Sequence, residues 1–247
     1  MMKYLAIFLA MVPCVAHAFT FDGDVPTVIR NQITNDLGFM TSIQGNGATP
    51  MHLHVFGQVN GGNYQKFFES RVTAVGMDDC GSAKAVACVI PFRGSSKIWL
   101  TQNYVKFDHP TVAKMMIVYH ESRHTEVRAG NWPHANCPVP FLDSSGHDMV
   151  SIWTGATLAG EPACDVTPFG SYGSSLILLK NIQKFCTNCT DKVRTDAGLY
   201  ADNQMGRIID PKAISAMRTD MYGATMESFQ RGPRYRRYRP SMFSPQL

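Results

Sequence analysis

The residues most able to do chemistry lie in the pentapeptide His120-Glu121-Ser122-Arg123-His124. On a helix, two histidines four residues apart face the same side, so both imidazoles can bind one metal ion. A glutamate beside them can accept a proton from a water molecule that the metal makes more acidic. The pattern therefore predicts metal-assisted hydrolysis with Zn²⁺ as the cofactor. The alternative is that both histidines are ordinary polar residues on a solvated helix face.

The residues before this motif predict the elements that would position it. Residues 97–101 form a short run typical of a β-strand, Asp108 offers a side-chain N-cap, and Pro110 suits a first helical turn. Gly130 predicts the end of the helix. A mainly apolar stripe at three- and four-residue spacing lies beside the two histidines and consists of Val112, Met115, Met116, Tyr119, Arg123 and Val127.

This strand, loop and helix with its H-E-x-x-H motif resembles the zincin metallopeptidases over about 70 residues, from the strand near residue 97 to Asp165. In that family the two histidines bind zinc and the glutamate is the general base. The resemblance implies these roles for His120, His124 and Glu121, and it implies peptidase activity.

A catalytic zinc site usually has three protein ligands, so a third ligand should follow His124. The first candidate is Glu161 in the segment 160–165, Gly-Glu-Pro-Ala-Cys-Asp. This segment resembles the second motif of the glutamate-zincins, in which a ligand glutamate precedes by four residues an aspartate that braces a zinc-bound histidine. Asp165 would be that aspartate. Pro162 would place Glu161 at the start of a helix.

Two other candidates resemble different zincin groups. His134 lies ten residues after His124 and beyond Gly130, which is similar to the metzincin plan of helix, glycine turn and third histidine, although the interval is longer. Asp165 is followed by residues 170–173, Gly-Ser-Tyr-Gly, which is loosely similar to the aspartate-zincins.

We rank Glu161 slightly ahead of Asp165 and His134, and His147 behind all three. Tyr172 could donate its hydroxyl hydrogen to a developing oxyanion, as tyrosines do in some zincins. Packing beside two glycines is the simpler role for that tyrosine.

The first residues predict export. Lys3 supplies a positive charge, residues 4–15 form an apolar core, and residues 16–18 read Ala-His-Ala, which fits a signal-peptide cleavage site before Phe19. The apolar run is too short to span a bilayer, so we expect no transmembrane segment in the mature chain. The protein would then be periplasmic or secreted.

Cleavage would remove Cys14 and leave six cysteines, an even number that predicts disulfides in an oxidising compartment. Pairing of cysteines that are close in sequence predicts the bonds Cys80–Cys88, Cys137–Cys164 and Cys186–Cys189. The second bond would tie the loop after the histidine helix to the segment that carries Glu161 and Asp165.

The pattern of predicted elements indicates an α+β fold. Residues 26–37 have helical spacing, and residues 52–59 and 85–92 are candidate strands. Mainly helices should follow Pro110, and they include the ranges 174–185 and 192–217. We expect one catalytic domain over residues 19–230. His52 and His54, on one face of a strand, could also bind a metal.

The last segment, residues 231–247, has no acidic residue and is predicted to be disordered. Removal of residues 1–18, with Lys3 as their only charged residue, lowers the formal net charge from +4 to +3. The arginines of this tail account for that excess of positive charge. For an exported protein, an anionic lipid, lipopolysaccharide or cell-wall polymer is a better partner for the tail than a nucleic acid. Its basic and aromatic residues are Arg231, Arg234, Tyr235, Arg236, Arg237, Tyr238 and Arg239.

Together these patterns predict an exported, disulfide-linked zinc metallohydrolase that cleaves peptide or cell-wall peptide bonds. The alternative is a non-catalytic envelope protein, with structural zinc or none, that its Arg/Tyr tail docks on an anionic surface.

Overall fold

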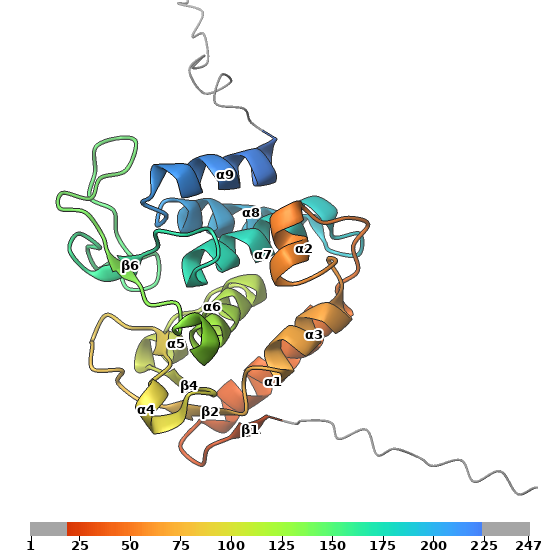
Figure 1. The fold of residues 1–247 in the computed structure, drawn as a ribbon. Helices are drawn as coiled ribbons and strands as arrows, with labels where there is room; N and C mark the ends of the chain where they lie inside the picture. Colours follow the sequence, from red (N-terminus) through yellow and green to blue (C-terminus); the bar gives the residue numbers. More distant parts are fainter. Residues whose placement is uncertain (1–18, 224–247) are drawn as a thin grey trace, which may run out of the picture. The chain divides into compact units, whose positions relative to one another are not determined.

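The computed structural model describes residues 19–223 (Figure 1). The predicted signal peptide, residues 1–18, and the predicted basic tail, residues 231–247, lie outside these described residues. The described chain forms two compact units, each built from several segments. The first unit consists of residues 19–43, 60–133 and 150–156, and the second consists of residues 44–59, 134–149 and 157–223.

A mixed four-stranded sheet lies in the first unit. Its strands are β1 (Thr20–Phe21), β2 (Ala74–Met77), β3 (Ala87–Cys88) and β4 (Lys97–Leu100), in the order β1-β2-β4-β3. The pairs β1–β2 and β2–β4 are parallel, whereas β3 runs antiparallel to β4. The strand predicted at 97–101 is confirmed, and the one predicted at 85–92 is reduced to the two residues of β3.

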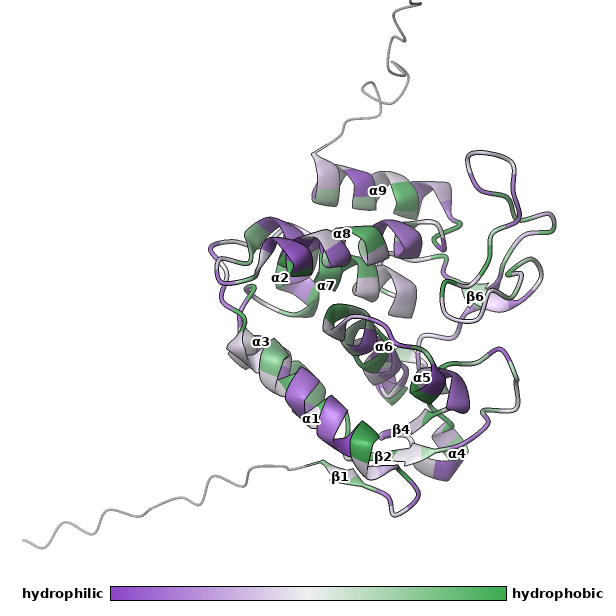
Figure 2. Ribbon diagram, turned by 180° about the vertical axis from the view of Figure 1, so that it is seen from behind, coloured by the Kyte–Doolittle hydropathy of each residue, from purple (hydrophilic) through white to green (hydrophobic). Residues whose placement is uncertain are grey.

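Helix α6, which carries the H-E-x-x-H motif, lies within the first unit. Nearly every side chain from Val112 to Arg123 is buried, because α6 packs against α1, β3 and β4. The hydropathy colouring shows apolar and polar residues mixed along α6 (Figure 2). The buried residues of this helix accordingly include the polar Lys114, His120 and Ser122. The helices of this unit are α1 (Thr27–Ser42), α3 (Gly61–Glu69), α4 (Pro91–Gly94), α5 (Gln102–Lys106) and α6 (Thr111–His124).

The two ends of α6 differ from the prediction. Pro110 occupies the N-cap position without a side-chain hydrogen bond, so the expected cap by Asp108 is wrong. The α-helix ends at His124 instead of near Gly130, and a 3₁₀ turn, η1 (Val127–Ala129), follows it. Gly130 then adopts a left-handed conformation with φ 67°, which glycine permits without steric cost.

The second unit is mainly helical. Helices α7 and α8 pack along each other, and α2 and α9 both contact α7. The predicted helix at 174–185 is confirmed, with an earlier start, whereas the single helix predicted over 192–217 is two helices. The elements of this unit are α2 (Pro50–Val55), α7 (Ser171–Phe185), α8 (Asp191–Met205), α9 (Pro211–Tyr222) and the antiparallel strands β5 (Ala135–Asn136) and β6 (Pro162–Cys164).

The strand predicted at 52–59 is wrong, because its first residues belong to α2. Thr49 caps this helix by accepting a hydrogen bond from the backbone N–H of His52, and Pro50 fits its first turn. His52 and His54 therefore do not share a strand face. His52 is fully buried and its Nδ1 lies 2.7 Å from the carbonyl oxygen of Gly57, whereas the ring of His54 packs against Phe169.

All three predicted disulfides are present: Cys80–Cys88 in the first unit, and Cys137–Cys164 and Cys186–Cys189 in the second. Cys137 and Cys164 also form a small apolar core with Phe141 and Leu158. The mixed sheet, the later helices and the three bonds confirm the α+β, disulfide-linked fold. Among residues 19–223, no helix is both long and apolar enough to cross a membrane.

Candidate metal centre

Helix α6 places His120 and His124 one turn apart, with their ring centroids separated by 5.1 Å. His120 is only 5% exposed, and His124 is half-buried. His120 therefore does not lie on a solvated helix face. A buried imidazole needs polar partners, and a metal ion is one such partner.

The tautomer of His124 follows from its hydrogen bond to the chain after the helix. Its Nδ1 lies 2.8 Å from the carbonyl oxygen of Asn131. Because a carbonyl oxygen can only accept, Nδ1 carries the hydrogen, and the neutral ring then has its lone pair on Nε2. This is the arrangement found in metal-binding histidines, whose second nitrogen donates to a carbonyl or carboxylate.

In the second unit, Asp165 provides the same kind of support to His134. Nδ1 of His134 lies 2.9 Å from Oδ1 of Asp165, and the strand pairing of Ala135 with Cys164 holds the two neighbouring residues together. The carboxylate is only 2% exposed. It fixes the ring orientation of His134 and leaves Nε2 as the nitrogen that can face a metal.

The N-terminus of α7 stabilises the buried charge of Asp165. Oδ2 accepts hydrogen bonds from the backbone N–H groups of Tyr172, at 2.8 Å, and Gly173, at 3.3 Å. These amides belong to the first turn of the helix, where the helix dipole favours an anion. Gly170 permits this approach, because a Cβ at that position would overlap the carboxylate.

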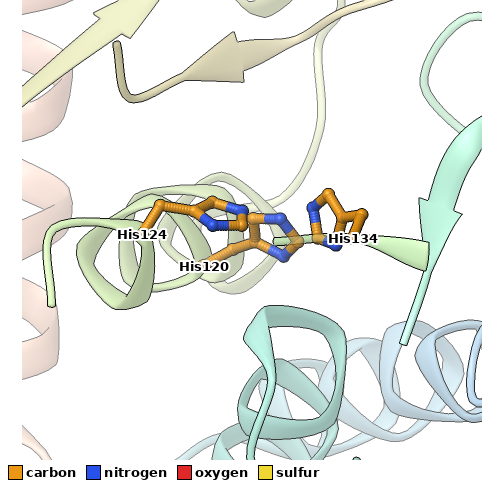
Figure 3. Close-up of side chains that lie close together, drawn as sticks. All are labelled: His120, His124 and His134. Carbon is orange, nitrogen blue, oxygen red and sulfur yellow. The ribbon is translucent and has the colours of Figure 1, made fainter. Parts of the chain in front are cut away.

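His120, His124 and His134 form a group that could hold a metal ion (Figure 3). One ligand nitrogen from each residue lies within 4.8 Å of the other two. Nitrogens around a tetrahedral zinc are about 3.3 Å apart, given bonds of roughly 2.0–2.1 Å. The 4.8 Å limit exceeds this spacing by about 1.5 Å, and imidazole nitrogens are common ligands of such metals.

Glu121 follows His120 directly in the sequence, and its carboxyl group is buried. Glu121 is 5% exposed, and burial raises its pKa to about 8. Its Oε2 has no hydrogen-bond partner among the described residues. A buried carboxyl oxygen without a partner is costly in a folded protein, and a catalytic role is one reason for which such a group is retained.

The structure places the other candidates outside the three-histidine group. Glu161 directly precedes strand β6, so the helix start expected for it is wrong. Asp165 contacts His134 but is not a member of the group. The side chain of His147 is 82% exposed and lies near Asp143.

Tyr172, the candidate oxyanion donor, lies in the first turn of α7. Its ring stacks on that of His134, with a centroid distance of 4.5 Å and an interplanar angle of 30°. Its hydroxyl oxygen accepts a hydrogen bond of 2.9 Å from Arg207. The stacking gives Tyr172 a packing role beside the third histidine.

Two supporting residues were not found from the sequence. Asn131 follows Gly130, and this pair predicts a left-handed turn, but nothing in the pattern indicates its hydrogen bonds to His124. Arg207 lies 42 residues after Asp165 in the sequence, and no motif marks it.

The chain matches no protein-family model, and the comparisons with curated proteins and with solved structures found no match.

Proposed function

We propose that the protein is an exported, zinc-dependent peptidase of the zincin type, with His120, His124 and His134 as its metal ligands. The observation that carries this proposal is the group formed by the three imidazoles. The proposal assigns the third position to His134 instead of Glu161, which makes the site similar to the metzincin plan of helix, turn and third histidine. The three disulfides support an oxidising compartment, and hence export.

The number and type of ligands favour catalytic zinc. Imidazole nitrogens suit zinc, although copper, iron and nickel also bind them. A structural zinc site usually has four protein ligands, whereas a catalytic site has three and leaves one position for water or substrate. Within residues 19–223 the group has three members, which is the catalytic number.

Each residue has a defined part in the proposed reaction. A zinc ion held there would polarise the scissile carbonyl and make water more acidic. Glu121, in its ionised form, accepts a proton from the attacking water and passes it to the leaving amine. The nearby cation would favour that form, against the effect of burial. Tyr172 is the proposed donor to the developing oxyanion.

The variant Glu121→Gln tests the proposed function. It should keep one zinc per chain and its fold, and should lose hydrolysis of a mixed peptide library that includes cell-wall peptides. Unchanged hydrolysis would show that Glu121 is not the base. A wild-type protein that binds zinc but cleaves no peptide in the library would favour the non-catalytic envelope role.

Docking of the protein on an anionic surface is a separate proposal that rests on the sequence of residues 231–247. Deletion of these residues should weaken binding to vesicles that contain anionic lipid and leave peptide hydrolysis intact. Equal vesicle binding by the full and shortened chains would contradict it.

A further inference from the structure

Three consecutive residues between His124 and His134 have left-handed backbone conformations. Gly130, Asn131 and Trp132 have φ values of 67°, 62° and 47°. Glycine adopts this conformation freely and asparagine tolerates it, but a tryptophan there is strained. Such strain persists only when surrounding contacts hold the backbone in place.

Glu126 makes those contacts. Its carboxylate accepts hydrogen bonds from Nε1 of Trp132 at 2.7 Å, from Nε of Arg71 at 2.7 Å and from Nη1 of Arg123 at 2.5 and 2.7 Å. Its backbone carbonyl accepts a further bond from the N–H of Asn131. One residue therefore ties the strained turn to the last turn of α6 and to Arg71, which follows α3 in the chain.

The same turn is fixed to a proposed metal ligand. The carbonyl of Asn131 accepts from Nδ1 of His124, and its side-chain amide donates to the backbone carbonyl of His124 at 2.6 Å. The guanidinium of Arg123 lies over the ring of Trp132, 4.6 Å from its centroid. The turn is thus held at Asn131 by backbone and side-chain bonds, and at Trp132 by its ring.

His134 is two residues after Trp132. A chain spans at most about 3.5 Å per residue, so the position of Trp132 limits where the third histidine can lie. We propose that Glu126 is a positioning residue for the metal site: by holding Trp132 in its left-handed conformation, it presents His134 to the metal that His120 and His124 bind. This inference rests on the proposed function.

The variant Trp132→Phe tests the proposal, because it removes the Nε1–H donor and keeps a ring beneath Arg123. Trp153→Phe is the control, since Trp153 is a buried tryptophan whose Nε1 has no hydrogen-bond partner among the described residues, whereas Trp132 is half-buried. Glu126→Gln removes the charge that Arg71 and Arg123 contact. The measurements are zinc affinity, by competition with a chelator, and the absorption spectrum of Co²⁺ bound in place of zinc, which reports ligand geometry.

We expect Trp132→Phe and Glu126→Gln to weaken zinc binding by about tenfold or more, as loss of residues that orient ligands does, and to alter the Co²⁺ spectrum. Trp153→Phe should change neither measurement. If Glu126 only stabilised the fold, Glu126→Gln would lower the resistance to urea without altering the Co²⁺ spectrum. That result would overturn the inference. A Trp132→Phe variant whose zinc affinity and Co²⁺ spectrum equal those of the wild type would also overturn the inference.

The two proposals fail in different ways. A wild-type protein that binds no zinc would overturn the proposed function, and this inference with it. A wild-type protein that binds zinc through the three histidines, together with an unaffected Trp132→Phe variant, would overturn this inference alone.

Discussion

Nδ1 of His134 donates a hydrogen bond of 2.9 Å to Oδ1 of Asp165, and the other oxygen of this carboxylate accepts from two backbone amides at the start of α7. Both oxygens of Asp165 are therefore engaged by protein groups. This carboxylate orients an imidazole and is poorly suited to be a direct metal ligand.

The first prediction concerns this carboxylate. Asp165→Asn should weaken zinc binding by about 10- to 100-fold, because an amide accepts less strongly from His134 and brings an N–H₂ group toward the helix amides. Glu161→Gln is the control and should leave zinc affinity unchanged. Competition with a chromogenic chelator measures both variants. The opposite ranking of the two variants would instead support Glu161 as the ligand expected from the sequence.

A second prediction follows from the raised pKa of Glu121. Burial raises this pKa from 4.5 to about 8 in the folded, metal-free protein. The folded state then binds more protons than the unfolded state between these two values, so stability falls as the pH rises from 4.5 to 8. At a pH above both values the loss would be at most about 5 kcal/mol.

Urea unfolding of the oxidised, zinc-free protein at pH 5 and pH 8.5 measures this effect. The glutamine side chain in Glu121→Gln is uncharged at both pH values. The variant should therefore lose most of the pH dependence of stability that the wild type shows between them. If the two proteins lose stability in parallel, Glu121 is not the buried acid that the structure shows.

A third prediction concerns unfolding by acid. Burial lowers the pKa of His52 from 6.5 to about 4. The folded state keeps this ring neutral, so its contribution to stability is present above pH 6.5 and is lost as the pH falls toward 4. The loss would reach about 3 kcal/mol. In His52→Asn the amide can still donate to the carbonyl of Gly57, but it does not titrate.

Free energies of unfolding between pH 7 and pH 4 should therefore fall more steeply for the wild type than for His52→Asn. The variant should also bind as much zinc as the wild type, because His52 is outside the three-histidine group. A steep acid transition that persists in the variant would contradict the assigned titration.

The fourth prediction compares two disulfides. The bond Cys137–Cys164 closes a loop with a sequence separation of 27 residues, whereas Cys186–Cys189 spans three. Replacing each pair by alanine should lower the free energy of unfolding by about 3–4 kcal/mol for the first and about 1.5 kcal/mol for the second. Only the first replacement should also weaken zinc binding, because Cys164 is adjacent to Asp165 and Cys137 follows β5. Equal zinc affinity in both variants would show that this bond does not help to position the site.

The sequence was informative where local rules decide the structure. The motif helix from Pro110 onward and the strand near residue 97 follow from spacing and from the choice of residues at their ends. The disulfides followed the simplest pairing of near neighbours. In contrast, residues 52–59 were assigned to a strand from their alternation, although Thr49 and Pro50 carry the signals of a helix start.

The third member of the histidine group could not be chosen from the sequence, for a physical reason. The interval from His124 to His134 is longer than in the metzincin plan. The 3₁₀ turn η1 and three left-handed residues take up this length, and contacts of Glu126 with residues as distant as Arg71 hold them. Backbone strain that depends on such contacts leaves no local pattern.

The central claim is that three histidines bind one zinc ion. Metal content by mass spectrometry, on purified oxidised protein reconstituted with zinc, tests it most directly. The wild type and Glu161→Ala should contain one zinc per chain, and His120→Ala, His124→Ala and His134→Ala should each contain little or none. Full zinc content in His134→Ala, or no metal in the wild type after reconstitution, would contradict the proposed site.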